Sequence, residues 1–446
     1  MGNGEWTENN FQIAEDIFRA GVEAVEPRKL VRDTLELSGT ILTVEGESYD
    51  LKSFQNVYLL GAGKSGEAMA GGVEDILGER ITGGIIVTTR STGLPSGRVP
   101  RRAASHPIPD GKGVQATEEL ISIAASAGPD DLVIVLLSGG GSALLSAPAS
   151  GVYLDDIQLL TALLLRSGAP ISELNTIRKH LSLVKGGGLA RMFYPARVLT
   201  IILSDVVGDD PGVIASGPTS PDPTTFRDCL EILERYGIRA EIPSRIRDHL
   251  ERGEKGMIPE TPDGSDPVFQ KVRNIVIGNN RLALQGAAEK ARQLGYRPVV
   301  VSDQITGDTT RSARLHCALA AAVSGRRRQG DTPVCLISGG ETTVVVKGTG
   351  RGGRNSEFVL VCARDIAGKL GTTVLSGGTD GIDAETPAAG AICDGSTVAR
   401  GEALGMNADE FLKRNDSYTY FQALGELLIT GLTGTNVMDL RIMLMD

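Results

Sequence analysis

The sequence has few aromatic residues and no excess of positive charge. Aromatic side chains make up 4% of the 446 residues, with a single tryptophan, and the formal net charge is −10. Proteins that bind nucleic acid generally present aromatic stacking platforms or basic surfaces to it. We therefore expect no nucleic-acid partner, while a local basic pocket stays compatible with this composition.

Patterns for metal clusters, export and membrane insertion are also lacking. The five cysteines include no Cys-x-x-Cys pair, and the four histidines are isolated. This excludes a typical structural zinc site and indicates buried thiols in a reducing compartment. The sequence begins without a signal-peptide pattern, and its longest aliphatic run, 132–137, is too short to cross a bilayer. We expect a cytoplasmic protein with no membrane contact.

Glycine, in contrast, is abundant, and its placement is informative. The 57 glycines cluster at the ends of apolar runs, and an apolar run followed by Ser-Gly-Gly occurs three times, at Ser138, Ser338 and Ser376. Backbone N–H groups approach a ligand closely only where side chains are small, and helix N-termini favour anions. These turns, together with nearby basic residues, predict binding of an anion, for which phosphate is the best candidate.

Apolar runs alternate with amphipathic helical segments in the first part of the chain, which predicts a parallel sheet covered on both faces. Strands and helices alternate again after residue 267, which predicts a second α/β domain. The length exceeds that of a usual single core. We predict a Rossmann-like N-terminal domain over 1–250, a linker rich in Gly, Pro and charge over 251–267, and a second α/β domain over 268–436. The final strand, 437–446, is predicted either to stay with the second domain or to return to the first.

In the first domain, a predicted strand runs into Gly61-Ala-Gly63-Lys64-Ser-Gly and a helix. This setting fits the dinucleotide fingerprint G-x-G-x-x-G. However, the next strand ends in Thr-Thr-Arg instead of the acidic residue that binds a ribose diol. Lys64 inside the turn favours direct contact with a small anion, whereas Arg90 keeps an NADP phosphate open as an alternative.

Other polar residues follow predicted strands and helices of this domain. The strand at 132–137 ends in a predicted phosphate loop, Ser138, Gly139, Gly140, Gly141 and Ser142. A predicted helix that begins at 171 carries Arg178 and Lys179 and ends in Lys185-Gly-Gly-Gly. Arg178 and Lys185 either offset the helix dipole or hold a carboxylate or phosphate. Asp205 directly follows the strand at 198–204, where open α/β sheets place their active sites.

The second domain has a comparable stretch at 335–357. A strand ends in Ser338-Gly-Gly, a second apolar run follows at 344–346, and a glycine loop then opens a helix. This loop holds the candidate anion-binding residues Arg351, Gly352, Gly353, Arg354 and Asn355. Three carboxylates at or just after Ser-Gly-Gly turns are candidate Mg²⁺ ligands or, alternatively, turn and cap residues: Glu341, Asp380 and Asp383.

Seven segments, in order, resemble the glycerate 2-kinase family, whose C-terminal part is the MOFRL domain: GAGKSG, LLSGGGSALL, NTIRKHLSLVKGGGLAR, SDVVGDDPGVIASGPT, SGGETTVVVKGTGRGGRNSE, GGTDGIDAETPAAGA and TGTNVMDL. The resemblance covers nearly the whole chain. It implies an ATP- and Mg²⁺-dependent kinase that converts D-glycerate to 2-phosphoglycerate in a cleft between two domains, with a homodimer as one oligomeric state. In that family the lysine of GAGKS and an arginine of RGGRN are regarded as essential, which implicates Lys64 and either Arg351 or Arg354. We favour Arg354, at the helix start.

Residues and resemblance together suggest roles for these groups. Lys64 neutralises the phosphoryl group or the glycerate, the loops at 138–142 and 350–354 cradle phosphates across a closable cleft, and Arg354 stabilises charge. Asp205 is the candidate base, and Arg178 and Lys185 are candidates for the substrate carboxylate. The alternative is an NADP-dependent hydroxypyruvate reductase, which would leave the second and third Ser-Gly-Gly turns without a task. A sugar-phosphate-binding regulator would need a basic DNA-binding element that the sequence lacks.

Overall fold

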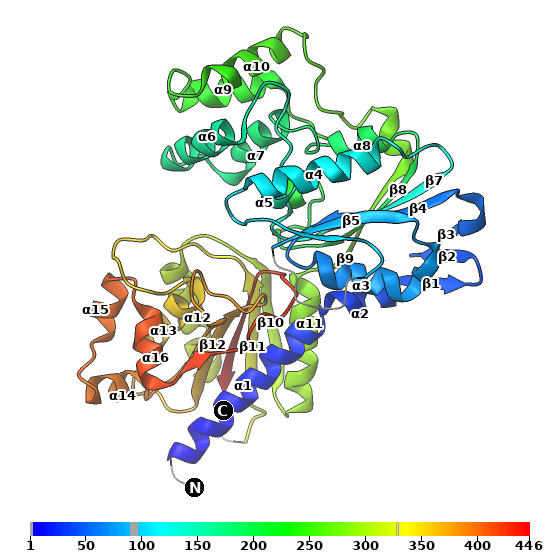
Figure 1. Cartoon of the computed structure of the whole chain (residues 1–446). Coiled ribbons are helices and arrows are strands. Elements are labelled where there is room, and N and C mark those ends of the chain that lie inside the picture. Colours follow the sequence, from blue (N-terminus) through cyan, green and yellow to red (C-terminus); the bar gives the residue numbers. More distant parts are fainter. Residues whose placement is uncertain (1–2, 90–96, 327, 329) are drawn as a thin grey trace. The chain divides into compact units, whose positions relative to one another are not determined.

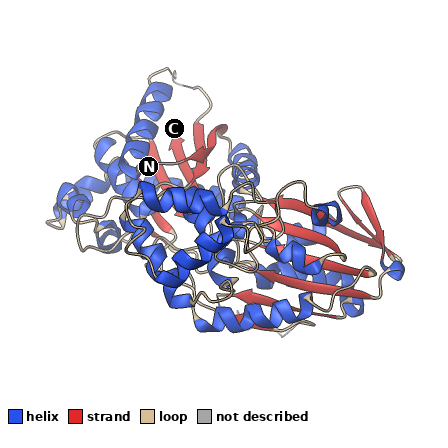
Figure 2. Ribbon diagram, turned by 90° about the horizontal axis from the view of Figure 1, so that it is seen from above, coloured by secondary structure: helices blue, strands red, loops and turns tan. Residues whose placement is uncertain are grey.

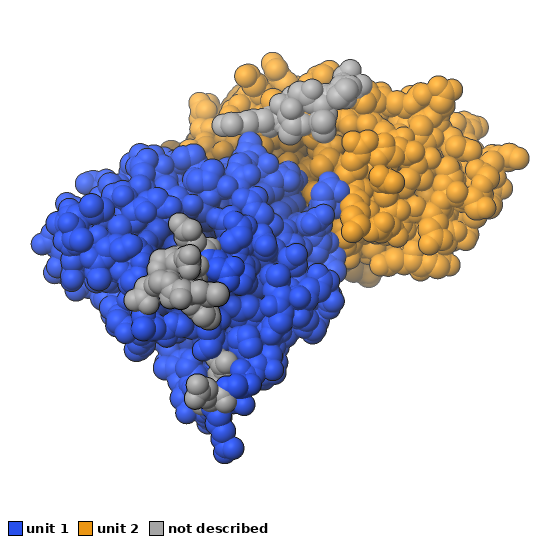
Figure 3. Space-filling model, turned by 90° about the horizontal axis from the view of Figure 1, so that it is seen from below, with its two compact units in different colours: residues 1–26, 278–446 blue, residues 27–277 orange. Residues whose placement is uncertain are grey.

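The computed structural model describes residues 3–89, 97–326, 328 and 330–446 (Figure 1). The chain forms two compact units, residues 27–277 and residues 1–26 with 278–446, which are coloured separately in Figure 3. Both units combine helices and strands (Figure 2), so the predicted α/β architecture is confirmed. All five cysteines are free and buried, as expected.

The first unit, residues 27–277, is built on a six-stranded sheet in the order β6-β5-β4-β7-β8-β9. The central strand β4 pairs in parallel with both β5 and β7. The order along the chain therefore reverses direction between β4 and β7, which is the switch point where such sheets bind ligands. The strands are β4 (Asn56–Ala62), β5 (Gly83–Thr88), β6 (Arg101–Ala103), β7 (Asp131–Leu137), β8 (Arg197–Leu203) and β9 (Val272–Gly278).

Helices cover this sheet because its strands are apolar on both faces; every residue of β7 is buried. One core joins side chains of β4, β5, β7 and β8 to α4 and α8. A second core lies among α6, α7, α9 and α10. The helices are α2 (Pro27–Thr34), α3 (Gly66–Leu77), α4 (Gly111–Ala124), α5 (Gly141–Leu144), α6 (Leu154–Arg166), α7 (Ile171–His180), α8 (Gly188–Phe193), α9 (Phe226–Arg235) and α10 (Ser244–Glu254).

The second unit contains a mixed sheet in the order β10-β11-β15-β12-β13-β14. Its central strand β15 is antiparallel to both β11 and β12, so Asp439 at its start lies opposite Gly340 and Gly378. The second and third Ser-Gly-Gly turns therefore flank the same residue. The strands are β10 (Arg297–Ile305), β11 (Val334–Gly340), β12 (Thr372–Gly378), β13 (Gly390–Asp394), β14 (Leu427–Leu428) and β15 (Asp439–Met445).

Alternate residues of β15 pack on opposite faces of this sheet, as the two-residue period of a strand requires. Leu440 and Ile442 join a core with α1 and α11, whereas Met443 joins one with α12 and α13. The helices are α1 (Asn3–Glu23), α11 (Asn280–Gln293), α12 (Thr309–Ser324), α13 (Arg354–Asp365), α14 (Thr397–Ala403), α15 (Ala408–Lys413) and α16 (Ser417–Leu424).

The boundaries of the units differ from the predicted ones. The first 26 residues belong to the second unit because α1 packs on α11. The strand at 272–278, predicted to open the second domain, is β9 of the first sheet, so the division falls at 277/278 and not over 251–267. The final strand stays in the second unit. The cleft expected between the units remains a prediction.

Smaller elements also differ from the expectations. The helix predicted to run from 171 to Lys185 ends at His180, so Lys185 lies in the turn before α8. The run at 344–346 forms no strand, and Val345 and Val346 are exposed. A three-stranded meander, β1 (Leu35–Ser38), β2 (Ile41–Val44) and β3 (Glu47–Asp50), was not predicted.

Candidate functional site

The glycine turns that follow β4 and β7 hydrogen-bond to each other at the switch point of the first sheet. The Lys64 N–H donates to the carbonyl of Gly139 over 2.8 Å, and the Ser65 N–H donates to Ser138 Oγ over 3.1 Å. Gly63 has φ +148°, and a Cβ there would lie 2.0 Å from Ser138 Oγ. Glycine is required at this position because the two turns touch, and the contact fixes the backbone of Lys64.

These contacts occupy the donors that a dinucleotide would use. Besides Lys64 and Ser65, the Gly63 N–H donates to Val87 over 3.1 Å and the Gly66 N–H donates to Gly63 over 3.1 Å. A Rossmann pyrophosphate binds N–H groups of this turn and the helix start. The geometry therefore argues against the NADP-binding alternative. Arg90, on which that alternative also rested, lies outside the described residues.

A cavity of about 630 Å³ opens beside these turns, entirely within the first unit. It brings together five predicted residues from separate parts of the sequence, Gly140, Ser142, Arg178, Lys185 and Asp205. Lys64 lies next to it, since a Cβ on the lining residue Gly140 would come 3.3 Å from Lys64 Cγ. The sequence did not single out three further lining residues, His106, Asn175 and Ser216.

Two cations dominate the electrostatics of this cavity. The Lys185 side chain is buried and donates from Nζ to the carbonyl of Leu145. Within the described residues, neither Lys185 nor Arg178 forms an ion pair with a carboxylate. Burial and the charge of Arg178 lower the pKa of Lys185 to about 7, and burial also lowers the pKa of Arg178. An anionic ligand would relieve both effects, so the cavity favours an anion.

Lys179, which follows Arg178 in α7, is a buried lysine with a structural role. Lys179 Nζ lies 3.3 Å from Asp222 Oδ1, and both side chains are buried. Asp222 Oδ2 also accepts a hydrogen bond from Thr261 over 3.0 Å. This pair is neutral overall and does not line the cavity. The contrast supports a ligand-binding role for the unpaired cations Arg178 and Lys185.

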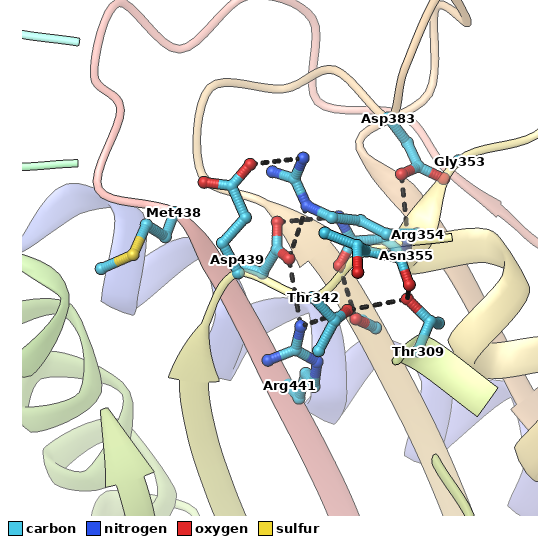
Figure 4. Close-up of polar contacts among 12 residues, drawn as sticks. Thr309, Thr342, Gly353, Arg354, Asn355, Asp383, Met438, Asp439 and Arg441 are labelled. Carbon is cyan, nitrogen blue, oxygen red and sulfur yellow. Dashed lines mark hydrogen bonds and ion pairs between the residues drawn. The ribbon is translucent and has the colours of Figure 1, made fainter. Parts of the chain in front are cut away.

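A second polar cluster surrounds Asp439, at the start of β15 (Figure 4). Its buried carboxylate accepts from Arg354 Nε over 2.8 Å, from Asn355 Nδ2 over 2.9 Å and from Arg441 Nη2 over 3.1 Å. Arg354 Nη1 also pairs with Glu341 over 2.9 Å. The Arg354 guanidinium is therefore held beside the turns that end β11 and β12.

The other arginine of the loop is placed differently. The Arg351 guanidinium lies over the ring of Tyr418, 4.5 Å from its centroid, and the residue is exposed. Its backbone N–H donates to the carboxylate of Asp416 over 2.9 Å. This geometry makes Arg351 a loop-stabilising residue and supports the preference for Arg354.

The glycine loop before α13 is not the open phosphate cradle that we predicted. The N–H groups of Gly350 and Gly353 donate to Arg414 O and Ser356 Oγ. A Cβ on Gly352 would lie 2.3 Å from Ser417 Oγ, and one on Gly353 would lie 2.3 Å from Asp383 Oδ1. The glycines allow close packing within the protein, which leaves these groups no room for a ligand.

The N-terminus of α13 already holds a carboxylate, that of Asp383. The Asn355 N–H and the Ser356 N–H donate to its two oxygens over 2.9 and 2.8 Å, and Ser356 Oγ donates over 2.6 Å. Negative charge at this position satisfies the free donors of the helix start. Asp383 therefore caps this helix, which is the alternative role that the sequence left open for it, and its binding of a metal stays a prediction.

The other two predicted metal ligands are also engaged. Glu341 pairs with Arg354, and Asp380 Oδ1 accepts from the Ile382 N–H over 3.2 Å. Across the parts of the chain that the structure describes, no group of three His, Cys, Asp or Glu residues could hold a metal ion. The predicted trio does not fit a preformed Mg²⁺ site.

Comparisons with known proteins cover nearly all of the chain. Residues 13–251 match a domain of unknown function, DUF4147, and residues 334–439 match the MOFRL family. The glycerate 2-kinase of Pyrococcus horikoshii is 38% identical over 433 residues, which are 95% of this chain and 96% of that protein. The chain belongs to the glycerate 2-kinase family.

Two further comparisons qualify what family membership implies. The crystal structure of a glycerate kinase from Thermotoga maritima matches with a TM-score of 0.84 at 37% identity, and the match covers 98% of this chain and all of that one. A relative from Agrobacterium vitis, 42% identical over 86% of this chain and 98% of its own, is named a putative hydroxypyruvate reductase. Both names thus occur among similar proteins. None of the described helices combines the length and apolar character of a membrane span.

Proposed function

We propose that this protein is an ATP-dependent glycerate 2-kinase, which transfers the γ-phosphoryl group of ATP to the 2-hydroxyl of D-glycerate and releases 2-phosphoglycerate and ADP. Full-length similarity to named glycerate 2-kinases supports the proposal. The observation that carries it is the cavity at the strand ends of the first sheet, where unpaired Arg178 and Lys185 lie with Asp205.

In this proposal each residue of the cavity has a task. Arg178 and Lys185 bind the carboxylate of glycerate and orient it. The 2-hydroxyl oxygen attacks the γ-phosphorus, the bond to the bridging oxygen of ADP breaks, and Asp205 takes the hydroxyl proton. Lys64, beside the cavity, offsets the charge of the phosphoryl group. Mg²⁺ would enter with the phosphates of ATP, since Mg²⁺ needs only one or two protein carboxylates.

One assay decides between the two names found among the relatives. Purified protein is incubated with D-glycerate, ATP and Mg²⁺, ADP release is followed, and the phosphorylated carbon is identified by NMR. We expect 2-phosphoglycerate. Absence of ADP release, together with NADPH oxidation in the presence of hydroxypyruvate, would overturn the kinase proposal. The cytoplasmic location and the homodimer remain proposals, which fractionation and light scattering would test.

Exchange of Arg354 should cost far more activity than exchange of Arg351. Arg354→Ala removes the guanidinium held by Asp439 and Glu341, and we expect kcat to fall by roughly 10²–10³-fold. Arg351→Ala removes a contact with Tyr418 at the surface and should have a much smaller effect. Arg354→Lys keeps the positive charge. If loss of this charge causes the fall in kcat of Arg354→Ala, Arg354→Lys should retain more activity than Arg354→Ala. An equal fall in kcat for Arg354→Ala and Arg351→Ala would contradict the proposal that Arg354 stabilises charge in the reaction.

The apparent affinity for D-glycerate should fall as the pH rises above about 7. Lys185, whose pKa burial and Arg178 lower to about 7, is charged below that pH and neutral above it in the free protein. At higher pH the bound carboxylate has to draw a proton onto the lysine, so KM should rise by up to about tenfold per pH unit. KM profiles between pH 6 and 9 would show this. In Lys185→Arg, where the cation does not titrate, the rise should disappear.

A further inference from the structure

Three polar side chains on the wall of the cavity form a hydrogen-bonded chain with a defined direction. Ser142 Oγ lies 2.7 Å from Ser216 Oγ, and Ser216 Oγ donates to Asn175 Oδ1 over 3.3 Å. An amide oxygen can only accept, so the single proton of Ser216 is used there. Ser142 must therefore donate its own proton to Ser216. The Ser142 oxygen then offers only lone pairs to a ligand, and it suits a ligand hydroxyl.

The backbone conformation around Ser216 fixes the position of its hydroxyl in this hydrogen-bonded chain. Ala215, Ser216 and Gly217 have φ values of +51°, +61° and +62°, and the first two are in a region that non-glycine residues rarely adopt. A Cβ on Gly141 would lie 2.7 Å from the Ala215 Cβ, so this strained segment packs tightly on the turn that carries Ser142. Strain of this kind persists where surrounding contacts fix it, often at functional sites.

The same segment is tied to the cation-bearing turn. The carbonyls of Ser216 and Gly217 accept from the N–H groups of Gly186 and Gly187 over 3.0 and 2.7 Å. These glycines directly follow Lys185, and Asn175 is one helical turn before Arg178 on α7. The hydroxyl acceptor and the two carboxylate-binding cations therefore belong to one connected wall of the cavity, which matches a ligand that has a carboxylate and a hydroxyl a few atoms apart.

We propose that Ser142, oriented by Ser216 and Asn175, accepts a hydrogen bond from the 3-hydroxyl of the acceptor and so selects dihydroxy acids over monohydroxy acids. The inference rests on the proposed function, in which the 2-hydroxyl is the group that reacts and the 3-hydroxyl is left free. An analogue in which C3 is a methyl group, with no 3-hydroxyl, leaves the Ser142 oxygen without a hydrogen-bond donor. Sites built to bond a substrate hydroxyl discriminate strongly against such analogues.

The test compares D-glycerate with D-lactate, which lacks the 3-hydroxyl. For the wild-type protein we expect kcat/KM for D-glycerate to exceed that for D-lactate by about 100-fold or more. In Ser142→Ala the value for D-glycerate should fall toward that for D-lactate, with D-lactate little affected. Equal losses for both substrates would overturn the inference and assign Ser142 to phosphate binding, which both reactions share. An unchanged preference would overturn it as well.

A second variant covers the case in which Ser142→Ala does not fold. Ser216→Ala keeps the Ser142 hydroxyl but removes its acceptor, so the preference for D-glycerate should shrink while some activity remains; an unchanged preference counts against the inference. Ser167→Ala, which deletes a hydroxyl bonded to Leu163 O at the end of α6, is the control and should keep the preference. If the wild-type protein phosphorylates neither acid, the proposed function fails. If it phosphorylates D-glycerate without preference, only this inference fails.

Discussion

Replacing Lys185 with methionine is expected to abolish most glycerate phosphorylation and, at the same time, to make the protein more stable. The lysine is buried without a carboxylate partner in the described structure, and its pKa of about 7 lies far below the ordinary 10.5. At 1.36 kcal/mol per pKa unit, this gap corresponds to about 5 kcal/mol of destabilisation below pH 7. Methionine has a similar length and no charge, and loss of the hydrogen bond to Leu145 costs only about 1 kcal/mol.

The pH dependence gives this prediction its sharpest form. Because the folded-state pKa is lowered, the penalty is fully present below pH 7 and disappears as the pH rises toward 10.5, where the unfolded chain also loses the proton. The gain in melting temperature for Lys185→Met should therefore be largest near pH 6 and small near pH 10. It should be measured without phosphate or citrate, which could occupy the cavity. We expect kcat/KM to fall by roughly 10²–10³-fold.

Lys179→Met is the matched control, since it exchanges a neighbouring buried lysine that does have a partner. Its removal leaves the Asp222 carboxylate buried and unpaired, so the melting temperature should fall. Opposite shifts in the two variants would show that Lys185 is kept for ligand binding at a cost in stability. If Lys185→Met lowered the melting temperature as Lys179→Met is expected to do, the claim that Lys185 destabilises the protein because it lacks a carboxylate partner would be wrong.

Replacing Asp383 with alanine should destabilise the second unit by about 3 kcal/mol, equally with Mg²⁺ and with EDTA. Its carboxylate accepts two backbone hydrogen bonds from the start of α13 and one from Ser356, and all three donors are buried. Loss of a cap costs about 1 kcal/mol, and each buried donor left unsatisfied costs about 1–3 kcal/mol. Denaturant unfolding of the variant measures the loss.

Asp380→Ala is the control for this experiment, because Asp380 is only partly buried and its hydrogen bond from the Ile382 N–H belongs to a local turn. We expect it to cost less than about 1 kcal/mol. A destabilisation of Asp383→Ala that appeared only when Mg²⁺ was present would restore the metal-ligand hypothesis and contradict the assignment of Asp383 as a helix cap.

The elements that the sequence predicted well are those with local signals. The strands β4 and β7 were predicted because each is an apolar run that leads directly into a glycine turn, so the signal lies within the segment itself. Ser142 and Asp205 could be proposed because they follow strands of one parallel sheet, where the strand ends converge. Arg178 and Lys185 could be proposed because they are cations in and just after the last turn of α7.

What the sequence did not reveal depends on partners far along the chain. The strand β9 resembles any other apolar run, and nothing within it shows which sheet it joins. The glycines and arginines before α13 suggested an anion site, but the anion is Asp383, 28 residues away. Ser216 gave no signal either, because its positive φ goes with the packing of the neighbouring Ala215 on Gly141 and with the hydrogen bond from Gly186, and not with its own residue type.

The placement of α1 has a consequence for biosynthesis. Ala14, Ile17 and Phe18 are buried against α11 and β15, which are made only after the whole of the 27–277 unit. At typical elongation rates the helix waits on the order of tens of seconds for these partners. During that time the inserted unit can complete its own sheet, while α1 exposes an apolar stripe. Closure of the second unit is therefore a late, long-range step of folding.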